Sequence, residues 1–258
     1  MKKEKEQLTV LGCDCDNTLF FHDARGFRKK DADAIEKFQK QGGVFGVVTG
    51  RSPKRGVTEL TEGEYPIRPD YYVYSNGACL MDGDGTILQE SFMPEEAVRA
   101  LYDRWKHRQV GFQTPEGNCT TVERKGTHWK QVYSADDFDM SRVFNVFFWM
   151  EDPEESDEIE AFAATLEGVT SARNTETIDV YGTANSKATG LRYFASKFAR
   201  EKDRPVRIVA LGDSGNDEPM IMDADLGATF ASSPENLRNK ADLIVDGAWE
   251  LIGHLNEE

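Results

Sequence analysis

The sequence of 258 residues predicts an α/β fold in which a parallel sheet is interrupted by a second α/β module. Short apolar segments alternate with amphipathic helical segments near both ends of the chain, and this alternation implies crossover connections and a parallel sheet. Between these parts the pattern changes to a hairpin followed by paired strands. We therefore expect residues 1–82 and 186–258 to form a core domain and residues 83–185 to form an inserted domain.

The stretch Leu8–Phe20 is the one around which the rest of the chain is expected to be arranged. Its apolar start predicts a buried central strand. The strand should end at Asp14, because burying carboxylates without partners is very costly. Asp14 and Asp16 then point to the same side, since alternate residues of an extended chain share a face. An ordinary polar turn after the strand is the alternative.

Cap residues and glycines set the remaining elements of the first core segment. Ser followed by Pro is a favourable start for a helix. The expected order is a polar loop at Phe21–Lys30, a helix capped by Asp31 and ended by Gly42-Gly43, a strand at Val44–Val48, a helix begun by Ser52-Pro53, and a strand at Tyr71–Tyr74.

The middle of the chain begins with a hairpin and continues with strands and two helices whose apolar residues lie along one stripe. The hairpin pairs Cys79–Met81 with Thr86–Leu88. The helices are expected at Pro94–Arg108 and from Pro153. The strands are expected at Val110–Gln113, Cys119–Glu123, His128–Tyr133, Val143–Met150, Gly168–Arg173 and Thr177–Tyr181.

The alternating pattern returns with a helix capped by Ser186. The following elements are expected at Val206–Leu211 (strand), Pro219–Met222 (short helix), Leu226–Phe230 (strand), Pro234–Ala241 (helix), Asp242–Val245 (strand) and Ala248–Leu255 (helix).

The charge balance of 31 basic and 46 acidic residues gives a net charge of −15. This sign disfavours binding to nucleic acid and to anionic membranes. A small anionic substrate would need local cations, such as magnesium and a well-placed lysine. The sequence has no apolar stretch of signal-peptide or membrane-spanning length, and its four cysteines lack C-x-x-C spacing, so we expect a cytoplasmic protein.

Four polar clusters follow the expected parallel strands or open the next helix, and in such sheets ligands bind at the rim formed by the strands' carboxyl ends. Each cluster alone fits a strand end, a solvated charge or a tight turn. Together they suit phosphoryl transfer, because a carboxylate can attack phosphorus and Mg²⁺ prefers hard oxygen ligands. The clusters are Asp14 with Asp16, Thr49 with Gly50, Lys187, and Asp213 with Asn216 and Asp217.

In this chemistry a hydroxyl from Thr49, the N–H of Gly50 and the ammonium of Lys187 hold the phosphoryl oxygens. The positive end of the helix that begins at Lys187 adds to this. Asp16 is expected to stay protonated beside a charged neighbour and to donate to the leaving oxygen.

The segments D-C-D-N-T-L, V-V-T-G-R-S, Ser186-Lys187 and G-D-S-G-N-D-E-P-M resemble the four motifs of the haloacid dehalogenase (HAD) superfamily. The S-N-G-A segment at Ser75–Ala78 and the long insert resemble its Cof-like, type IIB branch, which includes sugar-phosphate phosphatases. The resemblance implies a Rossmann-like parallel-sheet core with an inserted α/β cap domain of the C2 type.

By this resemblance Asp14 is the nucleophile and Asp16 the general acid and base, while Thr49 and Lys187 bind the phosphoryl group. The resemblance assigns Mg²⁺ to Asp14, the carbonyl of Asp16, and Asp213, with Asp217 as a ligand or behind one, and it places Asn216 at the phosphoryl group or beside its neighbours. The chain departs from the pattern at Asn17, where the family often has glycine, and at Ala188; Asn17 still tolerates a left-handed turn.

The insert is expected to act as a lid with crossings near Met81–Gly83 and Gly182–Asn185. Polar and aromatic side chains of the insert suit a sugar, although an exposed loop is an equal alternative. The candidate substrate residues are Asn76, Arg124, Lys125, His128 and Trp129.

We therefore expect a magnesium-dependent phosphatase that hydrolyses small phosphorylated metabolites, such as sugar phosphates, through an aspartyl-phosphate. A phosphomutase of the same superfamily is one alternative. A non-catalytic phospho-receiver is another, although the insert and Asp16 argue against it. The sequence indicates no oligomeric state.

Overall fold

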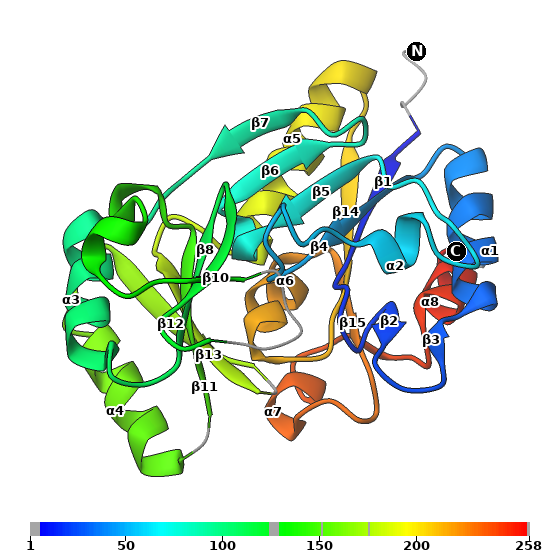
Figure 1. Ribbon diagram of the computed structural model, residues 1–258. Coiled ribbons are helices and arrows are strands. Elements are labelled where there is room, and N and C mark those ends of the chain that lie inside the picture. Colours follow the sequence, from blue (N-terminus) through cyan, green and yellow to red (C-terminus); the bar gives the residue numbers. More distant parts are fainter. Residues whose placement is uncertain (1–5, 124–128, 151, 175, 257–258) are drawn as a thin grey trace.

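The computed structural model describes residues 6–123, 129–150, 152–174 and 176–256, which form two α/β domains side by side (Figure 1). The core contains an eight-stranded sheet of order β16-β15-β14-β1-β4-β5-β6-β7, and the cap contains a six-stranded sheet of order β10-β9-β8-β11-β13-β12. The six strands from β16 to β5 pair in parallel, which confirms the expected α/β class.

The core strands agree with the apolar segments of the sequence, and the long helices begin and end near the expected caps. The strands of the core sheet are β1 (Leu8–Cys13), β4 (Val44–Val48), β5 (Tyr71–Tyr74), β6 (Cys79–Asp82), β7 (Ile87–Glu90), β14 (Val206–Leu211), β15 (Leu226–Thr229) and β16 (Leu243–Ile244). The helices of the core are α1 (Lys29–Lys40), α2 (Thr58–Thr61), α5 (Lys187–Lys202), α6 (Glu218–Asp223), α7 (Glu235–Arg238) and α8 (Ala248–Leu255).

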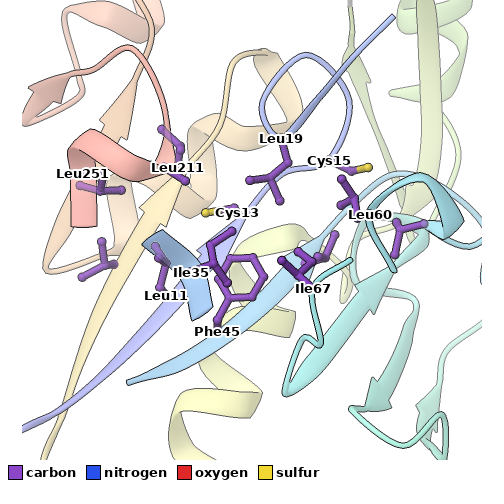
Figure 2. Close-up of a cluster of buried hydrophobic side chains, with 14 of the residues drawn as sticks. Leu11, Cys13, Cys15, Leu19, Ile35, Phe45, Leu60, Ile67, Leu211 and Leu251 are labelled. Atoms are coloured by element: carbon purple, nitrogen blue, oxygen red, sulfur yellow. The ribbon is translucent and has the colours of Figure 1, made fainter. Parts of the chain in front are cut away.

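Both faces of the core sheet are buried, because alternate residues of each central strand enter different hydrophobic clusters. Leu11 and Cys13 of β1 pack with Ile35 of α1 and Leu251 of α8 on one face (Figure 2). Val10 packs with helix α5 on the other face. Because β1 lies between β14 and β4, its carboxyl end is at the centre of the sheet.

The hairpin β6–β7 belongs to the core sheet, since β6 pairs antiparallel with β5 and β7 pairs with β6. The expected crossing near Met81–Gly83 is therefore not observed. Instead, the N–H of Ser91 donates to Ala78 of the core, and the N–H of Met93 donates to Val143 of the cap. We propose that the first boundary between core and cap lies between these residues, and that the second lies at residues 183–185, after β13 and before α5.

The cap sheet is covered on its outer face by two helices, α3 (Glu95–Trp105) and α4 (Pro153–Ala163), which lie away from the core (Figure 1). The apolar stripes of both helices pack against alternate residues of β8, β11 and β13 in a separate hydrophobic cluster. The other sheet face points to the core. The strands are β8 (Val110–Thr114), β9 (Gly117–Thr120), β10 (Lys130–Gln131), β11 (Asn145–Trp149), β12 (Val169–Arg173) and β13 (Thr177–Gly182).

Two local predictions in the first core segment are wrong. Ser52-Pro53 begins a turn rather than a helix, because Gly56 adopts a left-handed φ of 63° that stops helical continuation. Asp31 does not cap α1, which begins earlier; its buried carboxylate accepts from the N–H of Trp249 in the first turn of α8 at 3.0 Å.

The segment expected to be a loop before α1 contains a small hairpin, β2 (Phe20–Phe21) and β3 (Gly26–Phe27). Within the described parts of the chain, no helix combines the length and the apolar character that a membrane span requires.

Candidate active site

The predicted clusters meet at one end of the core sheet. Asp14 directly follows β1, Thr49 follows β4, and Asp213 lies two residues after β14. Lys187 is the first residue of α5, whose N-cap Ser186 accepts a hydrogen bond from the N–H of Thr189 at 3.0 Å. The α5 N-terminus approaches the S-N-G segment so closely that a side chain at Gly77, which has φ of 98°, would collide with the carbonyl of Ser186.

A buried lysine lies between two carboxylates at the centre of the site. Lys187 is 2% exposed, and its Nζ donates to Oδ1 of Asp14 and Oδ1 of Asp217, both at 2.6 Å. These carboxylates hold the pKa of Lys187 above its usual range although burial alone would lower it. Burial raises the pKa of Asp14 well above its usual value, and the charge of Lys187 offsets this only in part.

Three carboxylates form a set that fits a divalent cation. One oxygen from each of Asp14, Asp213 and Asp217 lies within 4.8 Å of the others. Burial and the nearby charge of Asp217 raise the pKa of Asp213 to about 6, as expected where several carboxylates share one small site. Both oxygens of Asp217 are engaged: Oδ1 binds Lys187, and Oδ2 accepts the N–H groups of Asp213 and Ser214, each at 3.0 Å. Hard oxygen donors of this kind suit Mg²⁺.

We expect Mg²⁺ to raise the thermal stability of the wild-type protein, because a cation that binds only the folded state stabilises it by about 2.7 kcal/mol at 100 times its Kd. The Asp213→Asn variant should lose most of this shift, since it removes a charged ligand. Thermal denaturation in EDTA and in Mg²⁺ measures the effect, with the exposed Asp84→Asn as a control. An unchanged shift in Asp213→Asn would place the cation elsewhere.

Asp16 was expected to stay protonated, but its surroundings favour the ionised carboxylate. Burial raises its pKa, but the Arg51 guanidinium and the His22 ring lower it more, so the net shift is downward. Arg51 binds both carboxylate oxygens, from Nη2 at 2.6 Å and from Nε at 2.8 Å, and His22 Nε2 lies 2.7 Å from Oδ1. Asn17, as expected, adopts a left-handed φ of 60° and turns the chain.

Thr49 and Gly50 lie beside these groups. Thr49 is buried, and its Oγ1 accepts the N–H of Arg51 at 3.1 Å. The carbonyl of Gly50 accepts Nε2 of Gln113, a cap residue, at 2.9 Å. A Cβ at Gly50 would lie 3.2 Å from Oδ1 of Asn76, a tight contact that would require Asn76 to shift slightly.

Asn76 is 1% exposed, and both ends of its amide are used by the protein. Nδ2 donates to Asp179 of the cap at 3.0 Å, and Oδ1 accepts Nδ2 of Asn216 at 3.1 Å. Asn76 therefore lies behind the cavity wall, and it supports Asn216 rather than presenting a free group to a substrate.

The inner face of the cap faces the site across an open cavity of about 790 Å³. The β11 register places Asn145 beside Gln113 of β8, and Phe147 beside Gly111 and Asp179. Of the expected cap residues, Trp129 lines the cavity and packs edge-on against Phe147 at 5.4 Å, whereas Arg124, Lys125 and His128 lie outside the described residues.

Sequence reasoning missed several cavity residues. A polar residue within an otherwise apolar strand is the signal that could have identified them: Asp179 lies between Ile178 and Val180, and alternation places it on the opposite face from both. The missed lining residues include His22, Arg51, Gln113, Asn118, Phe147, Asn174, Glu176, Thr177 and Asp179.

The parallel core, the inserted cap and the acidic strand ends define a hydrolase of the haloacid dehalogenase-like class. The chain matches the model of the haloacid dehalogenase-like hydrolase family over residues 11–250 and belongs to this family. The resemblance drawn from the four motifs is thus confirmed.

Individual relatives are more distant. An uncharacterized protein of Mycoplasma capricolum is 25% identical over 93% of this chain and 98% of its own. The 5-amino-6-(5-phospho-D-ribitylamino)uracil phosphatase of Bacillus subtilis is 20% identical over 95% of this chain and 93% of its own.

Two solved structures share the fold. A HAD phosphatase from Bacteroides thetaiotaomicron has a TM-score of 0.78 and 24% identity, covering 97% of this chain and 95% of its own. A HAD subclass IIB sugar phosphatase has a TM-score of 0.80 and 20% identity, covering 96% of this chain and 99% of its own. This chain therefore shares its fold with these two phosphatases.

Proposed function

We propose that this hydrolase is a magnesium-dependent phosphatase that hydrolyses small phosphate monoesters, sugar phosphates among them, through an aspartyl-phosphate. The observation that carries the proposal is the buried Lys187, whose ammonium lies 2.6 Å from both Asp14 and Asp217 at the floor of the cavity. A desolvated cation beside a carboxylate nucleophile stabilises the negative charge of the phosphoryl oxygens in the transition state of phosphoryl transfer. The names of the Bacillus and subclass IIB relatives support a phosphorylated, hydroxyl-rich substrate.

Asp14 attacks phosphorus through its carboxylate, and the P–O bond to the leaving alcohol breaks. Asp16 takes up a proton from solvent once it has left Arg51, and it gives this proton to the departing oxygen. It later takes a proton from the water that attacks the aspartyl-phosphate and releases inorganic phosphate. Asp16 must separate from Arg51 to exchange these protons, because the guanidinium occupies both of its oxygens.

Lys187, Thr49 and the N–H of Gly50 bind the phosphoryl oxygens, and Asn216 holds Lys187 in place at 3.3 Å. Asp14, Asp213 and the carbonyl of Asp16 would hold Mg²⁺, with Asp217 behind them as an acceptor for Lys187 and for the Asp213 N–H. The cation, when bound, supplies positive charge that lets a carboxylate approach an anionic phosphate.

Residues on the inner face of the cap are proposed to determine substrate specificity. Gln113, Asn118 and Asn174 place amides on the cavity wall, while Trp129 and Phe147 form an aromatic section of it. Amides suit the hydroxyls of a sugar, and an aromatic face suits the apolar side of a ring.

The four cysteines are free and buried, which supports the proposed cytoplasmic location.

The Trp129→Ala variant should change the ranking of substrates. We expect kcat/KM for a hexose phosphate to fall about 5- to 10-fold relative to that for methyl phosphate, because an aromatic contact contributes about 1 kcal/mol. Steady-state kinetics with both esters measures the ratio. Tyr133→Ala is the matched control, since Tyr133 is a cap aromatic residue that is 80% exposed. A parallel fall for both esters would remove Trp129 from substrate selection.

Release of inorganic phosphate from a panel of phosphate monoesters, with and without Mg²⁺, tests the function itself. The proposal predicts release that requires Mg²⁺. Conversion of a hexose phosphate to its isomer without free phosphate would instead identify a phosphomutase, and a stable phosphorylated protein without turnover would identify a receiver.

A further inference from the structure

A chain of hydrogen bonds joins the cap to the lysine beneath the site. Nζ of Lys187 donates to Oδ1 of Asn216 at 3.3 Å, Nδ2 of Asn216 donates to Oδ1 of Asn76 at 3.1 Å, and Nδ2 of Asn76 donates to Oδ2 of Asp179 at 3.0 Å. Asp179 lies on cap strand β13, and the other three residues belong to the core. We call these four residues the inter-domain chain.

The chemistry of its two ends gives the inter-domain chain a single direction. An ammonium group only donates hydrogen bonds, and Oδ2 of Asp179 accepts from the amide nitrogens that reach it. Each amide between them must therefore turn its oxygen toward Lys187 and its nitrogen toward Asp179. If Asn76 were reversed, its Nδ2 would face Nδ2 of Asn216, and two donors would oppose each other.

Asp179 is fixed firmly within the cap. It is 5% exposed, and it also accepts Nδ2 of Asn174 at 2.8 Å and Oγ1 of Thr177 at 3.0 Å. These donors are neutral, and burial raises the pKa of Asp179. Burying a carboxylate among neutral groups is unfavourable for folding, so stability alone does not account for this residue.

Asn76 is held in an unusual conformation at the same place. Its backbone is left-handed, with φ of 54° and ψ of 36°, and its N–H donates to the carbonyl of Thr49 at 3.2 Å. Such backbone strain occurs where the surroundings determine the position of a functional side chain. The amide of Asn76 thus lies at the meeting point of Thr49, Asn216 and the cap.

We propose that Asp179 is a positioning residue that sets the amide orientations of Asn76 and Asn216 when the cap is closed, and thereby holds Lys187 in its phosphate-binding position. The inference rests on the proposed function, because it takes Lys187 as a phosphoryl ligand. When the cap opens, the inter-domain chain loses its acceptor end, and both amides gain freedom. The phosphate site is then fully ordered only while the cap excludes water.

The test compares Asp179→Leu, which removes the acceptor at similar size, with Asp179→Asn, which can keep an oxygen facing Asn76. We expect Asp179→Leu to lower kcat for p-nitrophenyl phosphate about 10- to 100-fold, with a smaller change in KM. Asp179→Asn should recover most of this loss. In an Asn76→Ala background, Asp179→Leu should change kcat by no more than about twofold, because partners in one hydrogen-bonded chain are not additive.

Two further measurements separate positioning from general damage. Ser156→Ala removes another buried hydrogen bond of the cap, from Oγ to the carbonyl of Asp152, without touching the core, and it should keep wild-type kcat. Calorimetry with inorganic phosphate and Mg²⁺ should show weaker binding in Asp179→Leu and recovery in Asp179→Asn, without turnover.

The inference would be overturned if the kcat losses of Asp179→Leu and Asn76→Ala multiplied in the double variant. It would also be overturned if Asp179→Leu and Asp179→Asn lost equal amounts of kcat. A wild-type protein that neither hydrolyses phosphate esters nor binds phosphate would overturn the proposed function, and the inference with it. A wild-type protein that does both, with an Asp179→Leu variant that matches it, would overturn the inference alone.

Discussion

The Asp14→Asn variant is expected to lose turnover by at least about 10⁴-fold, because the amide oxygen is a very poor nucleophile and the change also removes a charged metal ligand. Phosphate release under saturating Mg²⁺ and substrate measures this loss. The variant should remain folded, since the side chain keeps its shape at a site where Asp14 is 4% exposed.

Stability provides the internal control for this variant. Burial and the surrounding carboxylates raise the pKa of Asp14, so its ionised form is less favourable in the folded protein than in the unfolded chain. In EDTA the unfolding temperature of Asp14→Asn should therefore equal or exceed that of the wild type. Wild-type turnover in this variant would reject Asp14 as the nucleophile, and a large fall in stability would show that its charge serves the fold.

The Lys187→Ala variant is expected to lower kcat about 10²- to 10³-fold, because the ammonium stabilises charge that develops during phosphoryl transfer. Lys187→Arg should restore little, since a planar guanidinium does not fit a space shaped for a compact ammonium between two carboxylates. Single-turnover rates measured on folded protein check this. A change confined to KM would mean that Lys187 contributes only to substrate binding.

Lys187→Ala should also destabilise the metal-free protein by about 3–5 kcal/mol, because it leaves Asp14 and Asp217 buried without a cation. Added Mg²⁺ should recover part of this loss. Lys197→Ala, in the same helix but paired with exposed Glu201, is the matched control and should change the free energy of unfolding much less.

The core of the site could be predicted from sequence because its chemistry follows local rules. Asp14 and Asp16 end an apolar strand, and Lys187 follows an N-cap serine; these placements need only strand and helix periodicity. The common edge of parallel strands then brings them together, as the structure shows.

The remaining parts depend on contacts between distant segments. Local propensity predicts a helix start at Ser52, where the structure has a turn. The left-handed Gly56 and the ion pairs of Arg51 with Asp16 and Glu59 produce this turn, and local propensity does not reveal them. Asp179 could not be placed at the site without the pairing of β13 with β11, which orients its face toward the core. The hairpin β6–β7 belongs to the core sheet because β6 pairs with β5. The turn sequence predicts the hairpin but does not indicate which sheet it extends.

The stereochemical course at phosphorus tests the central claim most directly, namely that the phosphoryl group passes through Asp14. Hydrolysis of a phosphorothioate monoester, made chiral at phosphorus by its sulfur and two oxygen isotopes, gives chiral thiophosphate in water labelled with the third oxygen isotope. The configuration of this product reports how many displacements occur. Attack by Asp14 followed by attack by water inverts phosphorus twice, so the account predicts net retention of configuration. Net inversion would show that water attacks the substrate directly, and it would contradict the assignment of Asp14 as the nucleophile.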